Sequence, residues 1–157
     1  MLLQLPRDYQ DLLEEFLAAE VDFVLIGGWA VAVHGHGRAT DDMDVLVRAT
    51  PDNSRRVFAA LQRFGAPLHQ HGVDAGLFAR EQYGYRFGRK PVLIEILTTI
   101  DGVDFDEALA GAVWVESGGV QIPVIGKRAL IRNKRASGRP KDLADLEVLD
   151  AEAAEPD

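Results

Sequence analysis

The spacing of apolar positions predicts helices in the first half of the chain and near its end. In residues 7–20 apolar side chains recur every three or four positions, the spacing of one helix face, and Pro6 suits the start of such a helix. Residues 50–64 carry the same pattern, and Gly65 is placed to end that helix. Further helices are predicted at 29–33, 104–110, 127–136 and 140–151.

Short apolar or alternating runs predict strands between these helices. The predicted strands are 21–26, 42–48, 91–99, 113–116 and 120–124, the last two joined as a hairpin. Residues 77–88 fit either a short helix or a strand with its turn. The order of elements predicts an α/β (α+β) fold, with a mixed β-sheet, helices packed on one face and a helical C-terminal subregion.

Length and composition favour one domain in the cytoplasm. From 157 residues we expect a single domain over 1–150 and a frayed acidic tail over 151–157. No apolar run approaches the roughly 18 residues of a membrane helix, so we expect no membrane partner. The chain has no cysteine and its start lacks a signal-peptide pattern, which favours a cytoplasmic location.

The charge is negative overall but unevenly distributed. A net charge of −8 argues against a protein that binds nucleic acid over its whole surface, because it repels phosphate. Residues 127–141 nevertheless contain seven basic side chains and no acidic one, whereas 142–157 contain seven acidic side chains and no basic one. These segments form either two solvated helix faces of opposite sign or a local site for an anion.

Two carboxylates on one predicted strand point to a metal site. Asp42 and Asp44 are two residues apart, so their side chains share one strand face, with Cα atoms roughly 6.6–6.8 Å apart. They repel each other unless a cation lies between them, and Mg²⁺ is the natural candidate because it prefers oxygen ligands. Asp41 has the opposite parity, so its side chain lies on the other face of the strand and it is the weakest of the three ligand candidates. The alternative is that these aspartates are exposed acidic side chains at the start of a surface strand and bind no metal.

Glu95 and a pair of glycines are further candidates for a site that holds a metal and a phosphate. Glu95 lies within an apolar strand, where an ionised carboxylate is costly unless a metal, a basic group or water meets it. It completes a metal site if it faces the paired aspartates; otherwise it reaches solvent at a strand edge. Gly27 and Gly28 follow the first strand, where a backbone without Cβ atoms and a helix N-terminus favour phosphate binding.

The segment 83–90 alternates aromatic and basic side chains. Such a segment either contacts nucleic acid by stacking and charge, or forms a hairpin with exposed basic residues. The four histidines, His34, His36, His69 and His71, lack a third ligand at zinc spacing, so we expect them at a helix end and in loops.

Taken together, the motifs resemble one protein family. They are Gly-Gly-Trp-Ala at 27–30, His-Gly-x-x-Arg-x-Thr-x-Asp-x-Asp at 34–44, Glu95 in a later apolar strand, and the segment 134–146. The set is similar to the nucleotidyltransferase-fold proteins of the DNA polymerase β superfamily, most of all to the small bacterial branch around the abortive-infection (toxin–antitoxin) nucleotidyltransferases. The likeness covers about residues 20–150. Two positions depart from the family pattern, since Glu95 stands where Asp is commoner and Trp29 where many members have Ser.

The resemblance implies a transferase that uses Mg²⁺ or Mn²⁺ and a nucleoside triphosphate. It would move a nucleoside monophosphate to an acceptor hydroxyl on an RNA end such as tRNA, on a protein or on a small molecule. By position, the catalytic and metal-binding residues are Asp42, Asp44 and Glu95, and the nucleotide-binding residues are Gly27, Gly28, Arg38, Thr40, Lys134 and Lys141. The alternative is a catalytically weak or inactive module that binds a nucleotide or a cognate toxin or antitoxin protein.

Overall fold

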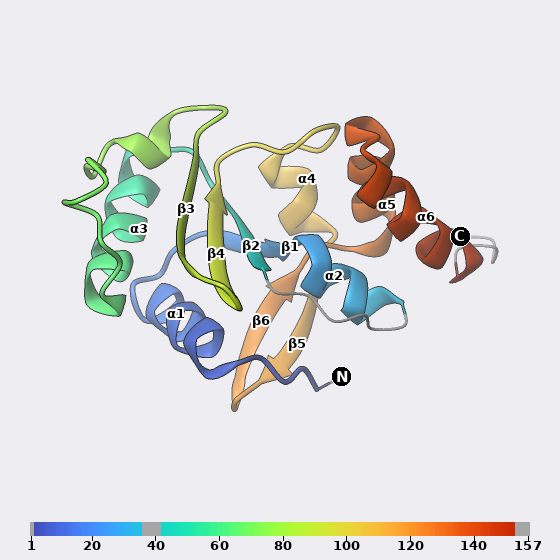
Figure 1. Ribbon diagram of the computed structural model, residues 1–157, viewed down its shortest axis with the longest axis horizontal. Helices are drawn as coiled ribbons and strands as arrows, with labels where there is room; N and C mark the ends of the chain where they lie inside the picture. Colours follow the sequence, from blue (N-terminus) through green and yellow to red (C-terminus); the bar gives the residue numbers. More distant parts are fainter. Residues whose placement is uncertain (1, 36–41, 153–157) are drawn as a thin grey trace.

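The computed structural model describes residues 2–35 and 42–152 (Figure 1). Its strands are β1 (Phe23–Ile26), β2 (Asp42–Val47), β3 (Gly84–Arg89), β4 (Val92–Leu97), β5 (Val113–Ser117) and β6 (Val120–Val124). Its helices are α1 (Arg7–Ala18), α2 (Gly27–His34), α3 (Pro51–Phe64), α4 (Phe105–Ala110), α5 (Lys127–Ser137) and α6 (Pro140–Glu152), with one 3₁₀ turn, η1 (Leu77–Ala79). None of these helices is both long and apolar enough to cross a bilayer.

The strands form one six-stranded sheet in the order β3-β4-β2-β1-β6-β5. β2 runs parallel to β4 and β1 runs parallel to β6, whereas the other neighbouring pairs are antiparallel. The pairing of β2 with β4 brings two segments that are far apart in sequence side by side in the sheet. The predicted fold class, a mixed sheet with packed helices and a helical C-terminal subregion, is confirmed.

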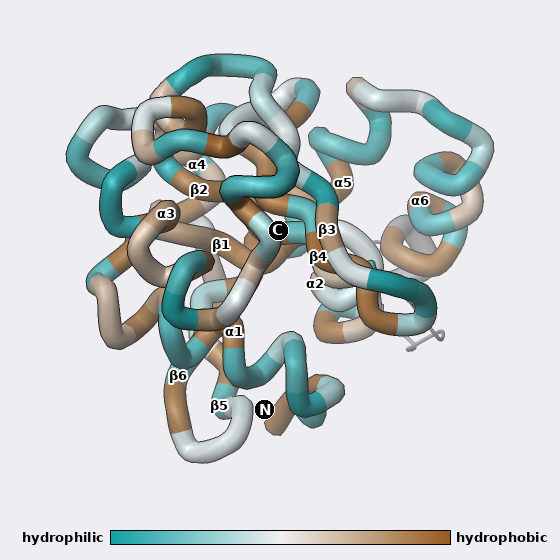
Figure 2. The backbone as a smooth tube through the Cα atoms, turned by 60° about the vertical axis from the view of Figure 1, so that its left-hand side comes forward, coloured by the Kyte–Doolittle hydropathy of each residue, from teal (hydrophilic) through white to brown (hydrophobic). Residues whose placement is uncertain are grey.

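An apolar core fills the space between one face of the sheet and helices α1 and α3. Phe16 of α1 meets Phe23 of β1 edge to face, with ring centroids 5.5 Å apart. Val45 and Ile96 share the sheet face of Phe23 and are fully buried. Each such side chain contributes about 1.5–3 kcal/mol through burial. Figure 2 shows β1 and β2 as hydrophobic segments near the centre of the molecule, with largely hydrophilic loops outside them.

The opposite face of the sheet carries the polar side chains of β2 and β4 and looks toward α5 and α6. Arg48, just after β2, binds Asp22 at 2.9 Å and Asp106 of α4 at 2.6 Å, which ties α4 to the end of the sheet.

α5 ends at Gly138, whose φ of 60° lies in the left-handed region that favours glycine. The chain then turns directly into α6, so the two C-terminal helices form the predicted helical subregion.

Several element boundaries differ from the sequence predictions; for example, α1 ends at Ala18 and β1 begins at Phe23. α2 begins at Gly27 rather than at residue 29, because Gly27 adopts a φ of 69° and lets the helix start directly after β1. Residues 77–88 contain both alternatives, the η1 turn and then β3, which pairs with β4 as a hairpin. α6 extends to Glu152, so the tail expected at 151–157 overlaps the end of that helix, and 153–157 lie outside the described residues.

Candidate active site

Three acidic side chains lie on one face of two adjacent strands. Glu95 of β4 is paired in register with Asp44 of β2, and Asp42 lies two residues earlier on β2, hence on the same face. The register is fixed by the alternating core residues Met43 and Val45, both fully buried on the other face. A slip of one residue would bury the carboxylates against the apolar core.

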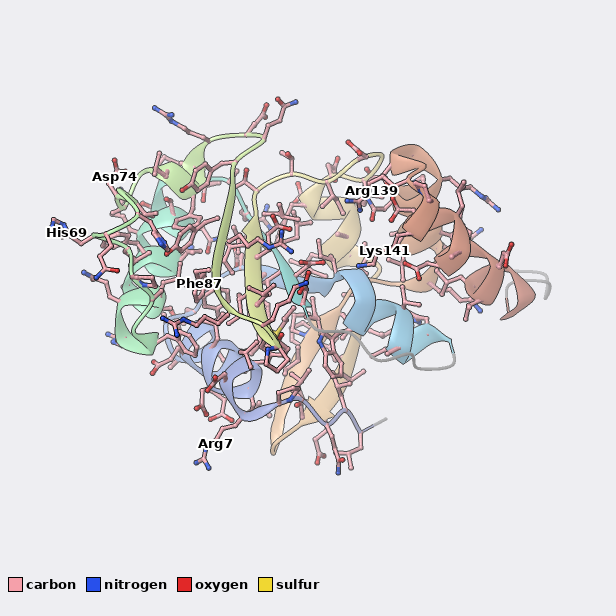
Figure 3. All side chains as sticks on the ribbon, in the orientation of Figure 1. Arg7, His69, Asp74, Phe87, Arg139 and Lys141 are labelled. Carbon is pink, nitrogen blue, oxygen red and sulfur yellow. The ribbon has the colours of Figure 1, made fainter. Side chains whose placement is uncertain are left out.

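These carboxylates line a hollow of about 550 Å³ that also involves α2 and the α5–α6 turn, a size typical of sites for small ligands. The predicted site residues that line it are Gly27, Gly28, Asp42, Asp44, Glu95, Lys134 and Lys141. Arg38 and Thr40, also predicted to bind the nucleotide, lie outside the described residues. Figure 3 shows Arg139 and Lys141 on the side of the C-terminal helices that is turned toward the sheet.

Gly27, the first residue of α2, lies directly against Asp44. Its φ of 69° is in the left-handed region, and a Cβ atom at this position would overlap Asp44 Oδ2. Ile26, the preceding residue, pairs with Asp44 in the register of β1 and β2. The glycine therefore allows the first turn of α2 to approach the carboxylate more closely than any other residue would.

Gly27→Ala should lower the free energy of unfolding by about 2–4 kcal/mol, because left-handed strain and overpacking add. Gly72→Ala is the matched control, since Gly72 has a φ of 67° but no described atom lies within 4 Å of the Cβ position. The control should lose only about 1–2 kcal/mol from backbone strain. Urea denaturation measures both variants, and equal losses would show that Asp44 does not crowd Gly27.

Asp44 lies where negative charge is concentrated. Burial, followed by the charges of Glu95 and Asp42, raises the pKa of Asp44 to about 6. Lys141 and Lys134 act in the opposite direction without cancelling the shift in pKa. Crowded carboxylates of this kind are relieved by a bound cation, and strongly perturbed groups in a hollow are typical of functional sites.

Arg86 of β3 belongs to the site although the motifs did not identify it. Its Nη2 donates a hydrogen bond to Asp42 Oδ2 at 2.9 Å. The sequence indicated only that the segment 83–90 contacts nucleic acid or forms an exposed hairpin, and the structure shows a hairpin. Arg86 lies opposite Glu95 in that hairpin, a register that the aromatic and basic pattern does not encode.

Lys134 lines the hollow, but its ammonium group is paired within the C-terminal helices. Its Nζ lies 3.1 Å from a carboxylate oxygen of Asp142 and 3.1 Å from one of Asp145, and all three side chains are buried. Burial alone would raise the pKa of Asp142, but hydrogen bonds, first from Arg139 and then from Ser137, outweigh it and hold that pKa well below its usual range. This cluster fixes the α5–α6 turn that borders the hollow.

The chemistry of the three carboxylates fits Mg²⁺ or Mn²⁺. Hard cations prefer oxygen ligands, and a bound cation offsets both causes of the raised pKa of Asp44, first its burial and then its repulsion by Glu95 and Asp42. Within residues 2–35 and 42–152, no three or more acidic, histidine or cysteine side chains lie close enough to one another, as they stand, to hold a metal. Since Asp42 is paired with Arg86, binding of one cation by all three carboxylates requires side chains to rearrange.

The described histidines do not line the hollow. His34, at the end of α2, bonds to the carbonyl oxygen of Ile125, and burial lowers the pKa of its ring. His69 projects from the end of the molecule opposite α5 and α6 (Figure 3). His36 lies outside the described residues.

Comparison with solved structures identifies the fold. The lincosamide antibiotic adenylyltransferase LnuA, solved with lincomycin bound, matches with a TM-score of 0.59 and 16% identity over 94% of this chain and 97% of LnuA. The antibiotic-resistance factor ANT(2″)-Ia in solution matches with a TM-score of 0.61 and 16% identity, over 94% of this chain and 83% of that one. Its complex with adenylyl-2″-tobramycin matches with a TM-score of 0.56 and 14% identity, over 93% and 87% of the two chains.

Neither a family model nor a curated protein sequence matches the chain. The structural matches show that the chain has the nucleotidyltransferase fold. The resemblance to nucleotidyltransferase-fold proteins is thereby confirmed, whereas the toxin–antitoxin branch and the roles of individual residues stay predictions.

Proposed function

We propose that this protein, which has the nucleotidyltransferase fold, moves a nucleoside monophosphate from a nucleoside triphosphate to an acceptor hydroxyl. The observation that carries the proposal is the register of β2 and β4, which sets Asp44 beside Glu95 with Asp42 on the same face. Gly27 and Lys141 line the same hollow, so groups suited to phosphate lie close to groups suited to a metal. The likeness of the fold to two antibiotic-modifying proteins supports the same reaction class.

The triphosphate is held from two sides. Gly27 and Gly28 allow phosphate to approach the backbone of the first turn of α2. Lys141 supplies positive charge from the first turn of α6. Arg38 and Thr40 are assigned to nucleotide binding from the motif. Lys134, in the last turn of α5, contributes by holding the α5–α6 turn in place, because its ammonium group is shared by two buried carboxylates of α6.

Asp42, Asp44 and Glu95 hold Mg²⁺ or Mn²⁺ in this proposal. The ion, when bound, polarises the α-phosphate and neutralises charge on the leaving group. The acceptor oxygen forms a bond to the α-phosphorus while the bond from that phosphorus to the bridging oxygen breaks and pyrophosphate leaves. Glu95 takes up the proton of the acceptor hydroxyl or, where it serves as the third metal ligand, leaves that proton to solvent. Lys141 offsets the charge of the departing pyrophosphate.

A hydroxyl of a small molecule is the acceptor that we propose. LnuA was solved with lincomycin and ANT(2″)-Ia with an adenylylated tobramycin, and this chain aligns over most of the length of both. An RNA end such as tRNA and a protein side chain are the other acceptor classes. A cognate toxin or antitoxin is the partner that the sequence resemblance suggests.

Transfer of label from α-³²P-labelled nucleoside triphosphates tests the proposal. Each of the four triphosphates is incubated with the protein, Mg²⁺ or Mn²⁺, and lincomycin, tobramycin, total tRNA or a cell extract. We expect a labelled small-molecule product that EDTA abolishes. Label in tRNA or protein would change the acceptor class. Nucleotide binding without transfer to any acceptor would contradict the proposal and favour the inactive binding module.

A further inference from the structure

Arg86 forms an ion pair that spans the centre of the site. It lies on β3, an edge strand, directly opposite Glu95 of β4. Its Nη2 donates to Asp42 Oδ2 at 2.9 Å, and Asp42 belongs to β2, on the far side of β4. The side chain of Arg86 therefore reaches across the strand that carries Glu95 and lies over the acidic face of the sheet.

This ion pair competes with any cation for Asp42. An arginine keeps its proton throughout the pH range of proteins, so Arg86 releases Asp42 by moving and not by titrating. The side chain of Arg86 is 57% exposed and that of Asp42 is 28% exposed. An ion pair with this exposure contributes little stability, so a divalent cation can displace the guanidinium group.

The hollow offers Arg86 a second partner once a cation occupies the carboxylate. Gly27, Gly28 and Lys141 line the same hollow, where the triphosphate is proposed to bind. Guanidinium groups match phosphate oxygens in both geometry and charge. Without such an anion, a displaced Arg86 would be repelled by the neighbouring divalent cation.

We propose that Arg86 exchanges partners when the nucleotide binds. It pairs with Asp42 in the nucleotide-free protein and with a phosphate group of the metal–nucleotide complex in the loaded protein. This inference rests on the proposed function, since it takes a metal-bound nucleoside triphosphate as the occupant of the hollow. It adds a substrate-binding residue on β3, and it predicts that free cations bind weakly until a nucleotide arrives with one.

Arg86→Gln tests both partners of Arg86 at once. The exchange predicts that the affinity for free Mn²⁺ rises while the affinity for the metal–nucleotide complex falls. Mn²⁺ alone should bind about two- to fivefold more tightly, since one competitor for Asp42, the guanidinium group of Arg86, is removed. The complex of Mn²⁺ with α,β-methylene-ATP should bind about tenfold more weakly, since a charge-assisted contact with phosphate is lost. Isothermal titration calorimetry on the full chain measures both, with the α,β-methylene analogues of GTP, CTP and UTP in parallel.

Arg89→Gln is the matched control, because Arg89 is exposed on the same strand but does not line the active-site hollow. It removes the same charge and should leave both affinities within about twofold of wild type. Unchanged affinities in Arg86→Gln, or two affinities that shift in the same direction, would overturn the exchange and leave the proposed function standing. If the wild type binds neither Mn²⁺ nor any analogue, the proposed function fails and the exchange fails with it.

Discussion

Asp44→Asn is expected to reduce nucleotidyl transfer on the order of 100- to 1,000-fold, because it removes a charged ligand of the cation that is proposed to stabilise the reacting phosphate. Asparagine has nearly the same shape as aspartate, so it fits the space against Gly27 and leaves the hollow intact. Initial rates of label transfer at saturating nucleotide measure the loss. Asp11→Asn, an exposed position on α1, removes the same charge outside the hollow and should keep the wild-type rate.

The same substitution is expected to stabilise the metal-free protein above about pH 6. The pKa of Asp44 is raised from the ordinary value of 3.8 to about 6 on folding. Between these values the folded protein binds more protons than the unfolded chain, so wild-type stability falls as the pH rises. Asparagine does not titrate, and its advantage should therefore grow from near zero at low pH to about 1–3 kcal/mol above pH 6.

Urea denaturation in EDTA at pH 4 and pH 7.5 measures this difference. A variant that loses activity and gains stability only at the higher pH shows that Asp44 is kept charged for function at a cost in stability. A loss of stability at pH 7.5, or the same gain at both values, would contradict the assigned electrostatics.

Lys134→Met is expected to lower the free energy of unfolding by about 3 kcal/mol, because it removes the cation shared by two buried carboxylates, while Asp142 keeps its bonds from Arg139 and Ser137. Methionine occupies the space of the lysine stem but cannot donate to Asp142 or Asp145, each 3.1 Å from Nζ. The burial of both carboxylates prevents water from replacing the ammonium group. Urea denaturation at pH 7.5 measures the loss.

Lys141→Met is the control that distinguishes anchoring from substrate binding. Lys141 is exposed on the next helix and lines the same hollow, so its loss should change stability by no more than about 0.5 kcal/mol while it weakens nucleotide binding. If Lys134→Met instead keeps its stability and weakens nucleotide binding as Lys141→Met does, then Lys134 contacts the triphosphate directly.

The acidic face of β2 could be predicted from sequence because alternation is a local property of a strand. Asp42 and Asp44 therefore share a face whatever the rest of the chain does. Their approach to Glu95 depends on the parallel pairing of β2 with β4, which are separated in sequence by α3 and β3. Periodicity does not encode that pairing, and the resemblance to a known fold supplied it.

Arg86 and Asp142 escaped prediction because each acts through tertiary contacts. Arg86 reaches Asp42 only because β3 pairs with β4 in one register, and the short segment 77–88 has too little periodicity to reveal it. Asp142 meets Lys134 only because α6 packs against α5. The basic and acidic runs at 127–141 and 142–157 were visible as composition, but their pairing inside the helical subregion was not.

The central claim is that Asp42, Asp44 and Glu95 hold a divalent cation at the triphosphate. The most direct measurement is a crystal structure with Mn²⁺ and the α,β-methylene analogue of the nucleotide that the protein uses, with anomalous data at the manganese edge. We predict an anomalous peak among the three carboxylates, with the triphosphate between Gly27 and Lys141. A nucleotide bound outside this hollow, or an anomalous peak away from the carboxylates, would contradict the claim.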